Sequence, residues 1–238
     1  VDLLVIGAGA NGACVAYEAS KRGLKVALLD AGDIGCGTSC RSTKLLHGGV
    51  RYLELAFKTF DLAQLKLVRE ALLERAHWLA KVPFLAHRLE LALPTTGCLP
   101  KGYYRLGLGL YDALSGDKNI GTSRFLSQSE LKTALPLLRH DLNGGVAYSD
   151  GQFDDSRLNL LLALTAEKAG AILRTRCKVI KLEHQTDGKL CGAITESLLG
   201  CQERWHARAV VNATGIHVDS IRHLANPDLT PRILVSRG

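Results

Sequence analysis

The stretch Leu3–Gly12, which reads LLVIGAGANG, decides the fold of this chain. It opens with four apolar residues in a row, which is typical of a fully buried strand. The glycines that follow have the spacing Gly7-x-Gly9-x-x-Gly12. In such a motif Gly7 permits a tight turn, Gly9 lets the backbone approach a pyrophosphate, and Gly12 lets a helix pack closely on the strand. The stretch therefore predicts a strand, a phosphate-binding turn and a helix.

The residues after this stretch complete a βαβ unit. A face of small residues predicts a helix that ends near Gly23. Lys25–Leu29 predicts a second strand, and Asp30 follows it at the position where an acid accepts a hydrogen bond from a ribose hydroxyl. The combination favours a dinucleotide site. The alternative is an ordinary βαβ turn whose glycines serve packing only.

The composition narrows the class of protein. Of the 238 residues, 47% are hydrophobic and 22% are charged, which excludes a disordered chain. Seven cysteines without a CxxC pair argue against a disulfide framework or a metal site and favour a reducing compartment. The net charge of +7 favours anionic partners such as phosphorylated small molecules or an acidic membrane surface. Because the basic residues are scattered, no nucleic-acid partner is expected.

The middle of the chain contains two helix signals around a less regular region. Apolar residues at helical spacing predict an amphipathic helix over Thr59–Lys81 that ends before Pro83. Residues 83–150 contain several prolines and glycines, which predicts a second layer of short strands and helices. A further helix should follow, with Asp155 or Ser156 as its cap.

The last third of the chain predicts strands. Asp187-Gly188 is a hairpin turn signal between the strands Val179–Glu183 and Leu190–Ile194. Residues 209–215 predict a buried strand that runs into a glycine. The chain has no methionine and stops after an apolar run, so we expect it to be a piece of a longer protein.

Three further stretches carry a resemblance to a known family. Ser39–Glu54 reads SCRSTKLLHGGVRYLE, Tyr148–Asn159 reads YSDGQFDDSRLN, and Val211–Gly215 reads VNATG. Together with the glycine motif they resemble the FAD-dependent glycerol-3-phosphate dehydrogenases, membrane-associated flavoproteins of the D-amino-acid-oxidase superfamily. The resemblance covers essentially the whole chain in the family's order and spacing. Departures include Cys40, where a second serine is usual, and Ile216-His217 in place of a Pro-Trp or Pro-Phe pair.

The resemblance implies an α/β fold with two domains. A Rossmann-like FAD-binding domain of the glutathione-reductase-like kind would be combined with a second, α+β substrate domain. Residues 1–75 would form the first segment of the FAD-binding domain, residues 76–150 the substrate (cap) segment, and residues 151–238 the second FAD-binding segment. Because the family's chain continues beyond Gly238, the fold would be truncated at its C-terminal end.

The resemblance also assigns cofactor-binding roles. The residues that would hold the ADP half of FAD are Gly7, Gly9, Gly12 and Asp30. Those that would reach phosphates or the ribityl chain are Thr38, Ser39, Ser42 and Thr43. Those that would pass beside the isoalloxazine ring, close enough to require glycine, are Leu46, His47, Gly48 and Gly49. The backbone of Val179 would face the adenine. The residues that would close over the pyrophosphate are Ala213, Thr214 and Gly215.

Three side chains are candidates for the chemistry. Oxidation of an alcohol by a flavin needs a base for the hydroxyl proton, and a dianionic phosphate needs a fixed cation. Arg51 fits the phosphate or an oxyanion role, and the resemblance directs both Arg51 and Tyr52 into the substrate pocket. His47 is the local candidate for the base or for tuning the flavin. The alternatives are an ion pair of Arg51 with Glu54, a core position for Tyr52 and a structural role for His47.

The expected function is oxidation of sn-glycerol 3-phosphate to dihydroxyacetone phosphate, with electrons passed to a quinone. The expected location is the cytoplasmic face of an inner or plasma membrane, held peripherally, or the cytoplasm, and a homodimer is a further expectation. The basic helix over Thr59–Lys81 could lie on an anionic surface, although a solvated face is favoured. The rivals are an oxidase that uses oxygen, an amine-oxidising relative such as glycine or sarcosine oxidase, and a non-catalytic flavin-binding fragment.

Overall fold

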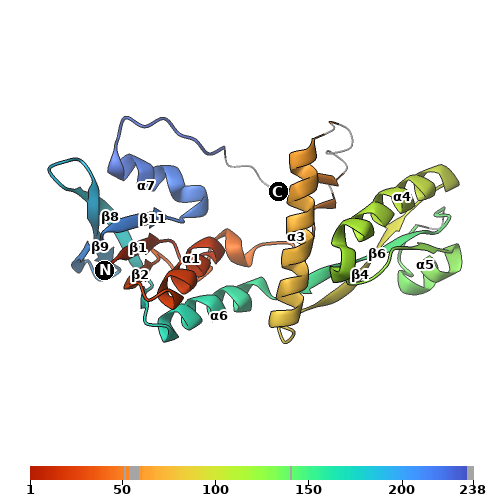
Figure 1. Cartoon of the computed structure of the whole chain (residues 1–238), viewed down its shortest axis with the longest axis horizontal. Helices are drawn as coiled ribbons and strands as arrows, with labels where there is room; N and C mark the ends of the chain where they lie inside the picture. Colours follow the sequence, from red (N-terminus) through yellow and green to blue (C-terminus); the bar gives the residue numbers. More distant parts are fainter. Residues whose placement is uncertain (51, 54–58, 60, 140, 235–238) are drawn as a thin grey trace. The chain divides into compact units, whose positions relative to one another are not determined.

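The computed structural model describes residues 1–238 apart from 51, 54–58, 60, 140 and 235–238 (Figure 1). It divides into two compact units. The first consists of Val1–Ser42 together with Asp155–Gly238, and the second of Thr43–Asp154. The chain thus leaves the first unit and returns to it after completing the second.

A parallel sheet forms the centre of the first unit, with the strand order β11-β1-β2-β7. The strands are β1 (Leu3–Ile6), β2 (Val26–Leu29), β7 (Ile172–Arg174) and β11 (Ala209–Asn212). Every residue of β2 is buried, as expected for a strand covered on both faces. The sheet confirms the α/β expectation and brings the carboxyl ends of β1, β2 and β11 to one edge, where ligands bind in sheets of this kind.

Two helices cover one face of this sheet. They are α1 (Ala10–Lys21) and α6 (Asp155–Lys168), which lie side by side in Figure 1. Fully buried alanines make the contact, among them Ala13 and Ala16 on α1 and Ala163 on α6. The small-residue face predicted for α1 therefore serves close helix packing. Asp155 and Ser156 are the first residues inside α6, so neither is the predicted N-cap.

An antiparallel sheet covers the opposite face. Its strands are β8 (Cys177–His184), β9 (Leu190–Ser197) and β10 (Gln202–His206), in the order β10-β9-β8. Val179 and Trp205 from this layer pack against Leu4 and Leu29 of the parallel sheet. The predicted hairpin at Asp187-Gly188 is confirmed, with Gly188 in the left-handed region at φ +83°. Helix α7 (Val218–Ala225) follows β11 and borders the same core.

The second unit is an antiparallel sheet with helices. Its strands are β3 (Leu45–Leu46), β4 (Ala86–Pro94), β5 (Arg124–Leu126) and β6 (Gly145–Phe153), and β6 pairs with each of the other three. The helices are α3 (Leu62–Lys81), α4 (Cys98–Ser115) and α5 (Gln128–Ala134). The long helix α3 ends before Pro83 as predicted, and Asp61 caps its start by accepting a hydrogen bond from the N–H of Ala63.

Two expectations need correction in this unit. Residues 83–150 are more regular than predicted, because β4 and β6 pair along nine residues each and α4 runs for 18 residues. Pro100 lies in the first turn of α4, where a missing N–H breaks no helical hydrogen bond. The first boundary lies at 42/43 rather than at 75/76. The reason is that β3 pairs with β6, which places residues 43–75 in the second unit.

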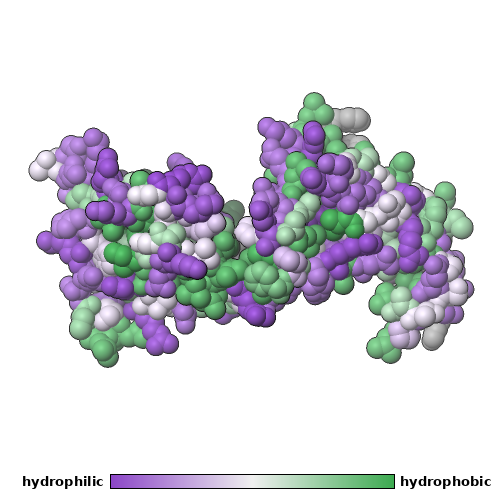
Figure 2. Space-filling model, turned by 60° about the horizontal axis from the view of Figure 1, so that its bottom comes forward, coloured by the Kyte–Doolittle hydropathy of each residue, from purple (hydrophilic) through white to green (hydrophobic). Residues whose placement is uncertain are grey.

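The surface of the molecule is mixed in character. Figure 2 shows that apolar side chains reach the surface in both units between charged ones. Within the described ranges, no helix combines the length and the hydropathy that crossing a bilayer requires.

Candidate functional site

A cavity of about 720 Å³ opens in the first unit, at the carboxyl ends of β1, β2 and β11. It gathers most of the residues that the sequence analysis assigned to the cofactor. Those that line it are Gly7, Gly9, Asp30, Thr38, Ser39, Val179, Ala213, Thr214 and Gly215. Residues to which the sequence analysis gave no cofactor role also line it, among them Lys178, His217 and Ser220. Segments far apart in the chain thus form one concave surface.

The glycine turn at the base of this cavity has no room for side chains. Gly7 has φ +103°, and a Cβ on it would lie 2.6 Å from the carbonyl oxygen of Ala213. A Cβ on Gly12 would lie 1.8 Å from the carbonyl oxygen of Gly7. The close packing predicted for Gly12 is therefore present. Helix α1 starts here with Gly9 as its N-cap, which has no side chain to bond the first-turn N–H groups; Ser39 takes the N–H of Ala10, and the following N–H groups have no capping side chain.

The carboxylate of Asp30 accepts hydrogen bonds from the backbone of two segments next to the cavity. Its Oδ2 accepts a 2.6 Å hydrogen bond from the N–H of Ala8, and its Oδ1 accepts one of 2.8 Å from the N–H of Gly32. The sequence predicted a carboxylate for a ribose hydroxyl at this position. In the structure the carboxylate lines the cavity and also connects the glycine turn to the end of β2.

Asn159 on α6 holds the same turn from the other side. Its Nδ2 donates a 2.9 Å hydrogen bond to the carbonyl oxygen of Ala8, which also accepts one from the N–H of Gly35. Asn159 is 2% exposed, and its Oδ1 has no hydrogen-bond partner among the described residues. The sequence analysis quoted Asn159 within a motif but gave it no role. A polar residue in a helix that buries alanines and leucines was the signal.

The hydroxyl-bearing residues after Gly37 make two different kinds of contact. Thr38 and Ser39 line the cavity, and the Oγ of Ser39 accepts a hydrogen bond from the N–H of Ala10 at the start of α1. Ser42 instead donates its hydroxyl to Asp155 Oδ2 at 2.7 Å. Asp155 is 4% exposed, so this contact fastens the end of the loop to α6 and accounts for the buried carboxylate.

The turn after β11 depends on one side chain that the sequence analysis left without a role. Asn212 Oδ1 accepts a 2.7 Å hydrogen bond from the hydroxyl of Thr214, and Asn212 Nδ2 donates to the carbonyl oxygen of Val218. These bonds fix the course of Ala213–Gly215 past the glycine turn. The three residues predicted to close over a pyrophosphate are thus held in one conformation.

The second unit contains the remaining predicted residues. They are Thr43, Leu46, His47, Gly48, Gly49 and Tyr52. Arg51 and its alternative partner Glu54 lie outside the described residues. Tyr52 is 49% exposed, which excludes the core position that was its alternative. Leu46 is half-buried in β3, opposite Gly151 of β6.

His47 is exposed and bonded to the turn that follows it. Its Nδ1 accepts a 3.2 Å hydrogen bond from the N–H of Gly49, which has φ +76°. A nitrogen that accepts a hydrogen bond cannot carry the proton, so neutral His47 has its proton on Nε2. His47 therefore presents a donor to its surroundings through Nε2.

Packing inside the second unit gives Gly48 a reason to be glycine that the sequence analysis did not name. A Cβ on it would lie 2.4 Å from Cδ2 of Leu72 and 2.7 Å from the hydroxyl oxygen of Tyr111. The sequence analysis attributed the requirement to a flavin ring. The packing of α3 and α4 inside the second unit is sufficient to explain it.

Comparison with known proteins adds a family to this geometry. Residues 2–238 match the family described as FAD dependent oxidoreductase. The chain is 42% identical over 229 residues to the probable mitochondrial glycerol-3-phosphate dehydrogenase of Caenorhabditis elegans, over 95% of this chain and 32% of that protein. It thus spans about a third of the length of the curated relatives it matches.

Two solved structures are similar as well. The glycerol-3-phosphate dehydrogenase of Bacillus halodurans, complexed with FAD, is 28% identical with a TM-score of 0.70, over 95% of this chain and 36% of that one. The L-alpha-glycerophosphate oxidase of Mycoplasma pneumoniae, with FAD bound, is 18% identical with a TM-score of 0.66, over 94% of this chain and 56% of that one. The second likeness concerns the fold alone.

Proposed function

The chain belongs to the FAD-dependent oxidoreductase family, and on that premise we propose that the whole protein oxidises sn-glycerol 3-phosphate to dihydroxyacetone phosphate. One observation carries the proposal. A chain that is 42% identical to a glycerol-3-phosphate dehydrogenase over 95% of its length folds so that Gly7, Gly9 and Asp30, which were assigned to the ADP half, line a single cavity.

The cavity of the first unit fits the ADP half of FAD. A side chain on Gly7 or Gly12 would fill the turn, and α1 begins at that turn, so its first-turn N–H groups and its dipole favour a pyrophosphate. Lys178 lines the cavity and adds a positive charge. Val179 would border the adenine, and Asp30 would accept from a ribose hydroxyl through the lone pairs that the backbone leaves available.

The residues of the second unit would act on the substrate side. When bound, FAD supplies an acceptor for the hydride that leaves the carbinol carbon. Arg51 would hold the phosphate of the substrate by a bidentate contact. His47 would donate a hydrogen bond from Nε2 to an oxygen that gains negative charge, because the Gly49 N–H occupies its Nδ1. We therefore assign removal of the hydroxyl proton to a group other than His47.

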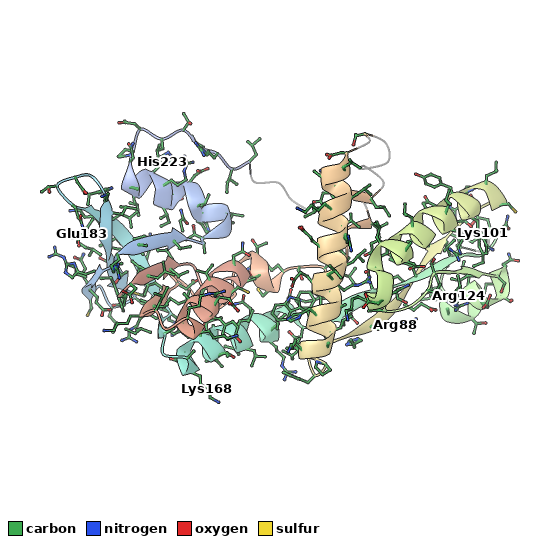
Figure 3. All side chains as sticks on the ribbon, viewed as in Figure 1. Arg88, Lys101, Arg124, Lys168, Glu183 and His223 are labelled. Carbon is green, nitrogen blue, oxygen red and sulfur yellow. The ribbon has the colours of Figure 1, made fainter. Side chains whose placement is uncertain are left out.

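We further propose that electrons pass to a quinone and that the protein associates peripherally with a membrane. The support is helix α4, which buries Leu108 and Tyr111 on one face and exposes Leu99 and Leu106 on another, at 89% and 77%. Lys101 on the same helix, labelled in Figure 3, is bonded through Nζ to the carbonyl oxygen of Leu126. The exposed apolar face of α4 suits the interface of a bilayer. Helix α3 is a poorer candidate, because its Arg75 is 2% exposed.

The deciding experiment uses the full-length holoprotein without oxygen. Addition of glycerol 3-phosphate should bleach the flavin absorbance, while glycerol and glycine should not. Bleaching by glycine instead would replace the proposal with an amine oxidase. A stoichiometric yield of peroxide when air is admitted, at a rate equal to turnover with a quinone analogue, would identify an oxidase.

A further inference from the structure

A chain of buried polar groups crosses the second unit and ends at the turn that contains His47. Arg75 on α3 donates a 2.7 Å hydrogen bond from Nη1 to Oδ1 of Asp150 on β6. The hydroxyl of Tyr111 on α4 donates to the same oxygen at 2.9 Å. The N–H of Gly48 donates to the oxygen of Tyr111 at 2.6 Å. Arg75, Tyr111 and Asp150 are each 2% exposed or less.

Packing alone does not account for these groups. Burying an ion pair usually stabilises a protein no more than apolar side chains of the same volume would. The pair also leaves Nε of Arg75 without a hydrogen-bond partner among the described residues. Leu72 and Val68 already join α3 to the core around Tyr111. The three polar side chains therefore need a role beyond holding α3 and α4 together.

The direction of the hydrogen bonds indicates what this role is. Burial raises the pKa of the Tyr111 hydroxyl, so the hydroxyl stays protonated and donates to Asp150. A hydroxyl that donates to a carboxylate is a stronger acceptor for the next donor in the chain. The next donor is the backbone N–H of Gly48, which lies 2.6 Å from the hydroxyl oxygen of Tyr111.

The residues beside Gly48 make contacts that extend this network to the rest of the turn. Gly49 lies in the left-handed region at φ +76°, and a Cβ on it would meet the ring of Tyr52 at 2.8 Å. The Gly49 N–H donates to His47 Nδ1. Anchoring the Gly48 N–H thus also sets the direction of the Gly49 N–H and, through it, the tautomer of His47.

We propose that Arg75, Asp150 and Tyr111 are positioning residues, which hold the His47–Gly49 turn so that His47 keeps its proton on Nε2. The inference rests on the proposed function for its consequence in catalysis. The positioning itself is a property of this chain and can be measured separately.

The test compares Tyr111→Phe with Tyr148→Phe in the full-length holoprotein. Tyr148 packs edge-on against Tyr111 at 6.5 Å between ring centroids, and its hydroxyl lies outside this chain of hydrogen bonds. Each variant therefore loses one hydroxyl from the same aromatic pair. The two readouts are hydrogen–deuterium exchange of a peptide that contains residues 45–49, and the anaerobic rate of flavin bleaching against glycerol 3-phosphate concentration.

Tyr111→Phe should raise amide exchange in this peptide about tenfold, because the N–H of Gly48 loses its acceptor. The maximal bleaching rate should fall about tenfold while the half-saturating substrate concentration changes little, since the turn acts on the reaction and not on phosphate binding. Tyr148→Phe should change neither quantity. Unchanged exchange in Tyr111→Phe, or equal effects of the two variants, would overturn the inference.

Two further outcomes are also decisive. If glycerol 3-phosphate fails to bleach the wild-type flavin, the proposed function is wrong, and faster exchange in Tyr111→Phe still supports the positioning of the turn. If Tyr111→Phe does not fold, Asp150→Asn replaces it, since the amide keeps the size and an acceptor and should give a smaller change in the same direction. Failure of both variants to fold while Tyr148→Phe folds would make the network a folding requirement and overturn the inference.

Discussion

The side-chain amide of Asn159 and the carbonyl oxygen of Ala8 are joined by a 2.9 Å hydrogen bond, although the two residues lie 151 positions apart in the chain. Ala8 stands inside the glycine turn, and its N–H is held at the same time by Asp30. The N–H and the carbonyl oxygen of Ala8 are therefore each bonded by a side chain from a different segment. The glycine turn owes its shape to α6 as well as to its glycines.

Replacing Asn159 with Ala should weaken cofactor binding. The variant loses the bond to Ala8 and leaves a small cavity, so the free energy of unfolding should fall by about 1–3 kcal/mol. The Kd for FAD, measured by quenching of flavin fluorescence on the full-length apoprotein, should rise about tenfold, because the turn is less well organised before binding.

Asn143→Ala is the matched control for that substitution. Asn143 also donates a 2.9 Å hydrogen bond to a backbone carbonyl, that of Thr96, but it lies exposed in the second unit. Its replacement should leave FAD affinity unchanged. An equal loss of affinity in the two variants would show that the Ala8 contact has no special role.

Two substitutions of His47 by amide side chains test whether its Nε2 acts as a hydrogen-bond donor. Glutamine at position 47 places an N–H₂ donor near the position of Nε2, whereas asparagine places its oxygen near Nδ1 and has no donor at the outer position. His47→Gln should keep kcat within about tenfold of wild type, while His47→Asn should lose about 100-fold, the usual effect of removing one donor from a developing oxyanion. Equal losses in the steady-state kcat of both variants would point to a base instead.

The capping box of α5 predicts an acid-sensitive contribution to stability. The carboxylate of Glu130 accepts hydrogen bonds from the N–H and hydroxyl of Ser127 and from Arg124, which lowers its pKa from 4.5 to about 2. A lowered pKa in the folded state means that this stabilisation is complete above pH 4.5 and is lost as the pH falls toward 2.

Glu130→Gln should therefore flatten the acid side of the stability curve. The thermal midpoint of the variant should fall less than that of wild type between pH 5 and pH 2.5, a window set by the shift of Glu130 from 4.5 to about 2. Glu167→Gln, an exposed change on α6, should follow the wild-type curve. Parallel curves for wild type and Glu130→Gln would refute the assignment.

If α4 contacts the membrane, replacing its exposed leucines should weaken binding to vesicles, and replacing an exposed leucine elsewhere should not. The double variant Leu99→Ser with Leu106→Ser removes two exposed leucines from the apolar face and should reduce co-sedimentation with anionic phospholipid vesicles about tenfold. Leu137→Ser removes a leucine that is 100% exposed elsewhere in the second unit and should have no effect. If both changes reduce sedimentation alike, or neither does, α4 is not the contact.

Local patterns in the sequence were sufficient for the βαβ unit. The four-residue apolar strand, the glycine spacing and the small-residue helix face each concern neighbours within a few residues, and the structure contains all three at Leu3–Lys21. The hairpin at Asp187-Gly188 was predictable for the same reason. Residues 83–150 were misjudged, because prolines and glycines in the first turn or on the open face of a helix do not interrupt it.

Contacts between distant segments could not be predicted from such patterns. Arg75 lies on the same face of α3 as the buried Val68 and Leu72, but helical spacing does not identify Asp150 as its partner. Asp155 was predicted as a helix cap, yet it lies inside α6 and its carboxylate binds Ser42. The resemblance assigns the pair Gly48-Gly49 to the cofactor. The structure also packs Gly48 closely against Leu72 and Tyr111, which the sequence pattern does not indicate.

The sequence by itself determined that this chain has a glycine turn between a buried strand and a helix, since that arrangement follows from backbone sterics over a dozen residues. It also carried the family resemblance. The tertiary structure alone decided which side chains hold the two functional turns. Asn159 reaches Ala8 and Tyr111 reaches Gly48 only after helices and strands have packed. The physical reason is that a buried hydrogen bond forms between whichever donor and acceptor the packed core leaves together, and chain spacing does not encode that choice.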